Sequence, residues 1–145
     1  DPLELDTRLQ AAGRWFANDL ALNGITNIGN PHEDSDGHDP GYRLTAQGYT
    51  WTSYGETIAL GTEDFADTPE EAVQGWMSSP PHKAILLGSY EHVGIGHKFL
   101  EEYPSTGEWE NAWVADFANT AGARSAPPAN CDPGYHENFF PFVGK

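Results

Sequence analysis

Three residues in separate parts of the chain have side chains that could do chemistry together: His32, Glu56 and His82. With Ser79 as an N-cap, His82 falls at the third residue of a helix, where the helix dipole disfavours an imidazolium. A neutral imidazole can bind a metal ion or accept a proton. Glu56 follows Gly55 just before an apolar segment, from which its carboxylate could point across a groove toward a histidine. Two imidazoles and one carboxylate would hold a divalent ion such as zinc and leave one coordination position open.

The ordinary interpretation of these histidines is a surface or hydrogen-bonded role, and spacing alone favours it. No short ligand motif such as H-E-x-x-H is present, so the spacing does not establish a metal site. Four further histidines have no evident partner in the sequence, and we assign them surface or structural roles: His38, His92, His97 and His136.

The segment from His32 to Asp39 resembles the beginning of a calcium-binding loop. Asp34 and Asp36 have the spacing of the first two EF-hand ligands. An EF-hand also needs Gly at its sixth position and Glu at its twelfth, and here these positions carry Asp39 and Thr45. We therefore interpret the segment as a solvated turn that caps the next helix, with a weak calcium site as the alternative.

A catalytic nucleophile is hard to find. Ser78 and Ser79 lie near His82, but Ser79 is expected to cap a helix, and no G-x-S-x-G motif occurs. Cys131 is the only cysteine, and it lies in a segment with no histidine-containing scaffold. A catalytic thiol is therefore not expected, and neither an intrachain disulfide nor a cysteine zinc site can form.

The composition indicates a folded domain and argues against nucleic acid as its partner. The 145 residues include 22 acidic and 7 basic ones, for a net charge of −15, which repels phosphate backbones and anionic membranes. Nucleic acid is therefore not an expected partner. Aromatic residues make up 12% of the chain, so a folded single domain is expected. The sequence contains no apolar run of ~18 residues, so no transmembrane segment is predicted. An export signal is expected to be removed or to lie outside this chain.

Periodicity and capping residues predict the elements of the first half. A first helix should carry one apolar stripe and end at Gly24, with Thr7 and Gln10 as its capping box; the stripe is Leu9, Ala12, Phe16 and Leu20. Asp39 and Pro40 predict the start of a short helix that Gly48 ends. A strand is expected near residues 57–60.

The second half begins with two helix starts. Thr68, Pro69 and Glu71 predict a capped helix with one apolar face, made of Ala72, Val73, Trp76 and Met77. Ser79 and Pro80 repeat the signal and predict a second helix after a break. Two β-rich segments, 93–99 and 113–117, should be strands joined by an acidic loop at 101–110. Residues 121–145 are expected to form an irregular tail packed on the domain.

Taken in order, several motifs resemble those of the CAP superfamily (SCP, PR-1 and antigen 5 proteins) in its compact bacterial type. They are His32-Glu-Asp-Ser-Asp-Gly, Tyr42-Arg-Leu, Ala46-Gln-Gly-Tyr-Thr-Trp51, Gly55-Glu-Thr-Ile-Ala59, Trp76-Met-Ser-Ser-Pro-Pro-His82-Lys-Ala-Ile-Leu86, Val93-Gly-Ile-Gly96 and Trp113-Val-Ala-Asp-Phe117. The resemblance implies an α+β fold, an α-β-α sandwich with a small antiparallel sheet between helical layers. It also implies a polar cleft lined by His32, Glu56 and His82.

The chain departs from this family pattern in four ways. Ser79 stands where eukaryotic members place a second glutamate, Thr57 replaces the usual Asn, and Pro81 replaces Gly. The usual first helix, before the segment equivalent to Leu3, is expected to be missing, so that residues 1–120 form a CAP domain without it. The incomplete set of cleft residues predicts weak metal affinity.

The resemblance implies function only in outline, because one fold hosts many functions. We expect a secreted, monomeric, non-enzymatic module that binds an apolar ligand such as a lipid, or a protein partner, with a cleft able to take a divalent cation, zinc first. The alternative is a metal-dependent hydrolase or protease, in which His32 and His82 hold the ion and Glu56 acts as the base toward water.

Overall fold

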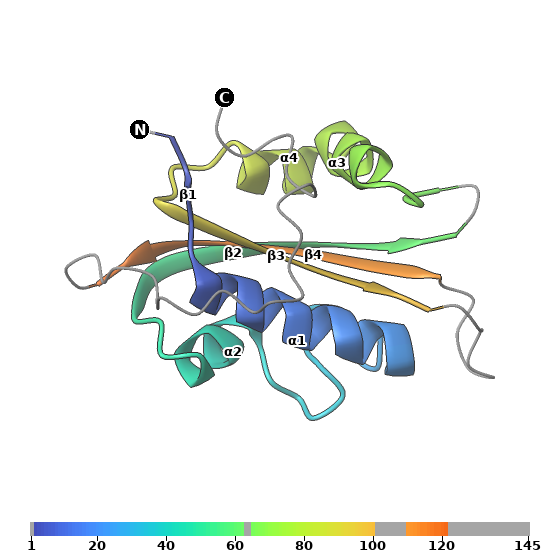
Figure 1. Ribbon diagram of the computed structural model, residues 1–145, viewed down its shortest axis with the longest axis horizontal. Helices are drawn as coiled ribbons and strands as arrows, with labels where there is room; N and C mark the ends of the chain where they lie inside the picture. Colours follow the sequence, from blue (N-terminus) through green and yellow to red (C-terminus); the bar gives the residue numbers. More distant parts are fainter. Residues whose placement is uncertain (1, 63–64, 101–109, 122–145) are drawn as a thin grey trace.

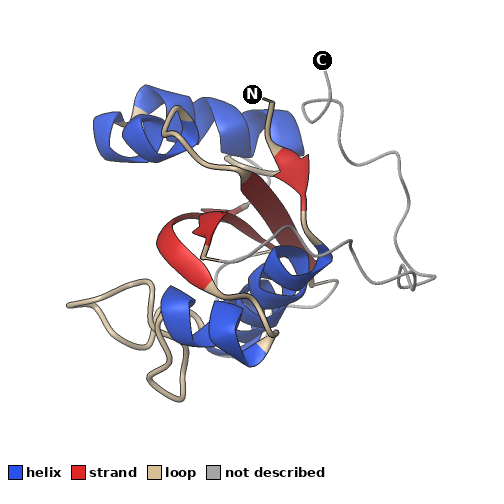
Figure 2. Ribbon diagram, turned by 90° about the vertical axis from the view of Figure 1, so that its left-hand side faces the viewer, coloured by secondary structure: helices blue, strands red, loops and turns tan. Residues whose placement is uncertain are grey.

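The computed structural model describes residues 2–62, 65–100 and 110–121. Its elements are β1 (Glu4–Leu5), α1 (Thr7–Asn23), α2 (Pro40–Ala46), β2 (Trp51–Gly61), α3 (Pro69–Ser78), α4 (Pro80–Leu86), β3 (His92–Phe99) and β4 (Asn111–Thr120). A single sheet lies between two helical layers: α1 and α2 cover one face, and α3 and α4 cover the other (Figures 1 and 2). The expected α-β-α sandwich is thus present.

The sheet has the strand order β1-β3-β4-β2. β4 pairs antiparallel with both β3 and β2, whereas the two-residue β1 pairs parallel with β3. The sheet is therefore mixed: it is antiparallel as expected, except at the edge formed by β1. The strand predicted at 57–60 is longer than expected and forms the opposite edge as Trp51–Gly61.

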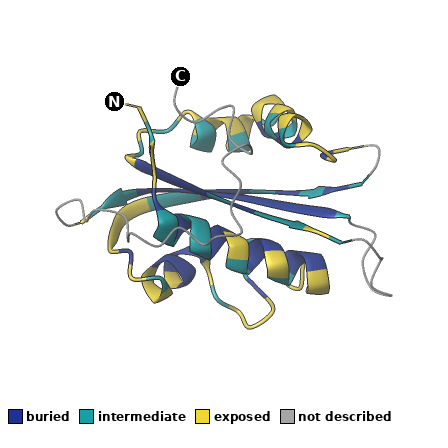
Figure 3. Cartoon of the chain, in the orientation of Figure 1, coloured by how far each residue is buried: buried dark blue, intermediate teal, exposed yellow. Residues whose placement is uncertain are grey.

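Side chains of β4 alternate between the two faces of the sheet, as strand geometry requires. Trp113, Ala115 and Phe117 pack with Trp76 of α3 in one core cluster. Val114 packs with α1 on the other face. Because both faces are covered by helices, buried residues run along the sheet while exposed residues gather on the outward sides of the helices (Figure 3).

Helix α1 starts differently from the prediction. Asp6 is its N-cap and accepts a hydrogen bond from the backbone N–H of Arg8, so the expected capping box of Thr7 and Gln10 was wrong. Aspartate caps better than threonine, and it precedes the apolar stripe by three residues. The predicted stripe is buried, and α1 rests on bare backbone of β3: a Cβ on Gly96 would lie 2.1 Å from the carbonyl carbon of Gly13.

Helix α2 begins and ends as the sequence predicts. The Asp39 side chain accepts a hydrogen bond from the Tyr42 N–H at 2.7 Å, and Pro40 is the first helical residue. Gly48, just beyond the C-cap, has a φ of 79°.

Helices α3 and α4 are separated by Ser79, as predicted. The capping box of Thr68 and Glu71 is formed, and the Trp76 indole donates to the Ile58 carbonyl at 2.8 Å, which ties α3 to β2. Two details of the prediction were wrong. Met77 is exposed rather than part of the buried face, and the Ser79 side chain makes no capping hydrogen bond to α4.

Several predictions lie outside the described residues. These are the loop at 101–109, the tail from residue 122 onward, and the roles of Cys131 and His136. Among the residues that are described, no helix combines the length and apolar character needed to cross a membrane.

Candidate functional site

Glu56 is a buried carboxylate on the face of β2 that α1 and α2 cover. Its strand neighbours on that face are Tyr54 and Ile58, both packed into the cores beneath these helices. Glu56 is only 4% exposed and lies opposite Asp116 in the register of β2 and β4. A carboxylate in this layer needs charged or hydrogen-bonding partners, because burial without them is costly.

Both oxygens of the Glu56 carboxylate have partners. Oε1 lies 2.8 Å from Nδ1 of His32, and Oε2 accepts a hydrogen bond from Nη2 of Arg43 at 2.7 Å. A carboxylate acceptor at Nδ1 requires the hydrogen of a neutral His32 ring to sit on Nδ1, which leaves the lone pair on Nε2. The His32 side chain is 31% exposed, so the ring links the buried carboxylate to solvent.

Arg43 holds this network together from a fully buried position on α2. Its guanidinium also donates to the carbonyl oxygens of His32 and His38, the shortest contact being 2.6 Å to His38. Its Cζ lies 3.9 Å from the centre of the Phe16 ring on α1. Arg43 therefore neutralises Glu56 and fixes the backbone of the His32 loop, so both the position and the orientation of the imidazole depend on it.

Asp116 completes the buried cluster. Burial, and then the neighbouring charge and hydrogen bond of Glu56, raise the pKa of Asp116 well above its usual range, opposed by the Arg43 charge. Oδ2 of Asp116 has no hydrogen-bond donor among the described residues. A proton on Asp116 accounts for both observations, because a protonated carboxyl can donate to Glu56 where two carboxylates would repel each other. The cluster is then one arginine cation and one glutamate anion, with Asp116 neutral.

His82 lies at the third residue of α4, the predicted position. α4 approaches β2 closely because Gly55 has no side chain: a Cβ there would lie 2.9 Å from Cγ2 of Ile85 and 2.6 Å from the Tyr90 hydroxyl oxygen. Burial lowers the pKa of His82, and the neighbouring His32 ring lowers it further. Both effects favour the neutral form of the His82 ring.

The structure places His32 and Glu56 in direct contact and brings His82 within electrostatic reach of His32. No described residue hydrogen-bonds to the His82 ring. In the described part of the chain, no group of three or more His, Cys, Asp or Glu side chains is arranged to hold a metal ion. Both Glu56 oxygens accept hydrogen bonds and the side chain is 1% exposed, so a metal ion would have to reach the carboxylate inside the protein. Its role as a ligand remains a prediction.

Sequence reasoning missed Arg43 and Asp116. Asp116 had a signal: it is the one carboxylate in a strand of mostly apolar residues. Arg43 had none beyond its place in a matching motif, because its burial depends on Phe16, Glu56 and the His32 loop, which converge only in the fold.

The remaining described histidines have structural partners that the sequence did not reveal. His38 contacts Asp34 and stacks on Tyr42, His92 contacts the Tyr49 hydroxyl, and His97 stacks on Trp113. The segment 32–39 caps α2 and residues 35–37 are exposed, as expected, but Asp34 departs from the interpretation as a solvated turn. It is 2% exposed, and its carboxylate accepts hydrogen bonds from the backbone N–H groups of Asp36 and His38.

A family model described as "CAP: Cysteine-rich secretory protein family" matches residues 1–117. The chain belongs to the CAP family. A relative in Bacillus subtilis (strain 168), the "Uncharacterized protein YkwD", is 31% identical over 97 residues. The match covers 66% of this chain and 35% of YkwD, so the chain spans about a third of that relative.

Two solved structures share the fold of this chain. An outer surface protein from Borrelia burgdorferi superposes with a TM-score of 0.66 at 21% identity, covering 83% of this chain and 79% of that one. An extracellular protein containing an SCP domain, from Bacillus anthracis str. Ames, gives a TM-score of 0.63 at 19% identity, covering 81% of this chain and 34% of that one. At these identities the likeness shows the fold alone.

Proposed function

We propose that this CAP domain is an extracellular binding module whose binding surface is formed by the His32 and His82 imidazoles. One observation carries the proposal: both oxygens of Glu56 and Nδ1 of His32 are occupied inside the protein. The chemistry left for a ligand is Nε2 of His32 and the neutral ring of His82. The family's description as secretory, and the extracellular relative from Bacillus anthracis, support an extracellular location.

Glu56 acts in this proposal as an orienting group. A carboxylate that accepts the second N–H of a histidine fixes its tautomer and makes the other nitrogen a better electron donor, a common arrangement behind metal-bound histidines. The two imidazoles can then take a divalent cation such as zinc, with the remaining positions left to water or to the ligand. A site with two protein ligands should bind zinc more weakly than the usual three or four.

The hydrolase alternative has less support. It requires Glu56 to accept a proton from water, yet the carboxylate is 1% exposed as a side chain and pairs with the buried guanidinium of Arg43. A general base must come within hydrogen-bond reach of the water that it activates. The geometry therefore favours binding over catalysis.

Calorimetry with zinc chloride tests the proposal. The wild type should bind one ion, the His32→Ala, His82→Ala double variant none, and Glu56→Gln about 10- to 100-fold more weakly. Affinity should fall as the pH drops through the lowered pKa of His82, because protons compete with the metal ion for that imidazole. His38→Ala is the control, since that histidine is engaged with Asp34 and should not contribute. Equal binding by the double variant and the wild type would refute the imidazole surface. Peptide hydrolysis that Glu56→Gln abolishes would favour the hydrolase.

A further inference from the structure

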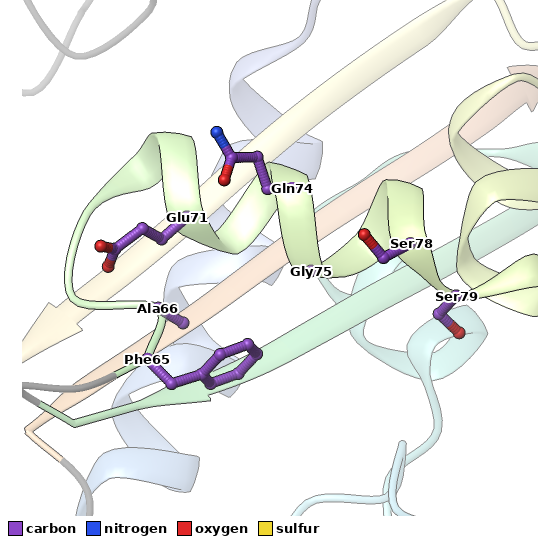
Figure 4. A pocket seen from close by; sticks show the side chains of 7 residues that line it. All are labelled: Phe65, Ala66, Glu71, Gln74, Gly75, Ser78 and Ser79. Carbon is purple, nitrogen blue, oxygen red and sulfur yellow. The ribbon is translucent and has the colours of Figure 1, made fainter.

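A second candidate site lies on the other helical layer. A hollow of about 440 Å³ opens between α3 and the turn that precedes it (Figure 4), lined by Phe65, Ala66, Glu71, Gln74, Gly75, Ser78 and Ser79. The helical positions 71, 74, 75 and 78 have the spacing i, i+3, i+4 and i+7, so they form one face of α3. Neither His32, Glu56 nor His82 lines this hollow, so it is separate from the imidazole surface.

The backbone of Phe65, which forms the aromatic wall of the hollow, is fixed by hydrogen bonds although its side chain is exposed. Phe65 is 53% exposed, and its backbone forms two hydrogen bonds with Thr62, at 2.8 and 3.0 Å. The next residue, Ala66, is fully buried with a φ of 52°, and its carbonyl accepts a hydrogen bond from the Trp113 indole at 2.8 Å. A non-glycine residue in the left-handed region is strained and persists only where its surroundings fix it. The fold therefore maintains a strained turn that presents an aromatic ring to solvent.

Gly75 seats that ring against the helix. A Cβ at this position would lie 3.1 Å from Cζ of Phe65, so the ring rests close to bare helical backbone. Figure 4 shows Phe65 lying beside α3, whereas the Glu71 side chain projects from the first turn of the helix and Ser78 lies further along it. The hollow thus places an apolar ring beside a helix face that carries polar groups.

Among the described residues, the polar lining consists of hydrogen-bond acceptors and neutral groups, with no Lys, Arg or His. In the capping box, Oε2 of Glu71 accepts hydrogen bonds from the backbone N–H groups of Asp67 and Thr68, at 2.9 and 3.3 Å. No hydrogen bond engages Oε1 within the described residues. The Ser79 hydroxyl does not cap α4 and remains available as an acceptor. With a net charge of −15 over the whole chain, the long-range field adds to the attraction for a cation.

We propose that this hollow binds an arginine side chain presented by a basic protein partner. A guanidinium is planar, stacks on aromatic faces and donates several hydrogen bonds in fixed directions. Phe65 supplies the stacking face, Glu71 the opposite charge through Oε1, and the serine hydroxyls further acceptors. The hydrogen bonds of Phe65 with Thr62 and the buried Ala66 fix the backbone from which Phe65 projects, so little backbone freedom is lost when the arginine binds.

A matched pair of small probes tests whether binding in the hollow requires the positive charge of the guanidinium. In an NMR titration of the ¹⁵N-labelled chain, N-acetyl-arginine amide should shift the amide signals of residues 65–79 saturably. N-acetyl-citrulline amide has the same shape without the charge, and it should bind at least about fivefold more weakly. Equal binding of the two probes would overturn the proposal. Shifts at these residues with N-acetylglucosamine but not with the arginine probe would overturn it in favour of a neutral sugar.

Variants then test the site itself. Glu71→Gln keeps a residue that can complete the capping box and should weaken arginine binding about fivefold. Glu70→Gln removes the same charge from a residue outside the hollow and should leave binding unchanged. Phe65→Leu should also weaken binding, with thermal melts checking that it folds. Equal losses in Glu70→Gln and Glu71→Gln would show a diffuse charge effect and refute the site. Because no zinc is involved, this outcome is independent of the imidazole proposal.

Discussion

Asp116 stands directly opposite Glu56 across β4 and β2, on the sheet face that α1 covers, and the pair shares the single buried cation of Arg43. One guanidinium cannot neutralise two carboxylates. The fold therefore favours the protonated form of Asp116, and we expect the stability of the cluster that orients His32 to depend on pH.

Asp116→Asn tests this protonation. Because the folded-state pKa of Asp116 is raised above its usual value of 3.8, the stability that its proton gives is full below pH ~4 and falls as the pH rises through the folded pKa. An amide mimics the protonated acid without titrating. The free energy of unfolding of the variant should equal that of the wild type near pH 4. With rising pH it should exceed the wild-type value by an amount that grows by at most about 1.4 kcal/mol per pH unit.

Urea denaturation at several pH values from 4 to 8 measures the difference. Asp36→Asn, at an exposed aspartate, is the control and should show no such trend. If Asp116→Asn were less stable than the wild type by the same amount at every pH, Asp116 would be ionised in the folded protein.

Removing Arg43 should be severely destabilising. Arg43→Met leaves Glu56 as an uncompensated buried charge, which typically costs about 3–5 kcal/mol. The double variant Arg43→Met, Glu56→Met should recover much of the loss, since the unpaired charge is gone. Arg14→Met provides the comparison: Arg14 is exposed on α1, and its loss should cost about 1 kcal/mol or less. Denaturation midpoints of the wild type and the three variants measure these losses. A loss for Arg43→Met no larger than for Arg14→Met would show that the cluster contributes little to stability.

Trp76 and His82 should respond differently to truncation. Trp76 is 5% exposed and anchors α3 to β2, so Trp76→Ala should cost about 3–5 kcal/mol and lower the melting temperature sharply. His82 makes no hydrogen bond to a described residue, so His82→Ala should change the melting temperature little. Thermal melts that show the two variants as equally damaging would make His82 a structural residue and weaken the case for the imidazole surface.

The elements of the fold were predictable where local signals and tertiary packing agree. Thr68 and Glu71 carry their capping box in the sequence itself, and Asp39 with Pro40 marks α2 equally well. The start of α1 was predicted wrongly because Thr7 and Asp6 are both capping residues, and only the pairing of Asp6 with Arg8 decides between them.

The site was predictable only in part. His32, Glu56 and His82 could be chosen from residue type and from a family resemblance, but the distribution of protons and charges among them could not. That distribution depends on Arg43 and Asp116, which approach Glu56 from α2 and β4. Contacts between residues far apart in the sequence, such as Glu56 and Asp116, leave no trace in local spacing.

The tautomer of His32 tests the central claim most directly. Long-range ¹H–¹⁵N correlation spectra of the imidazoles, recorded at a pH where the rings are neutral, show which nitrogen carries the hydrogen. The Glu56 contact at Nδ1 predicts the Nδ1–H form for His32, with Nε2 free, and predicts that this preference weakens in Glu56→Ala. An Nε2–H form of His32 in the wild type would contradict the account, because the nitrogen assigned to the ligand would already be protonated.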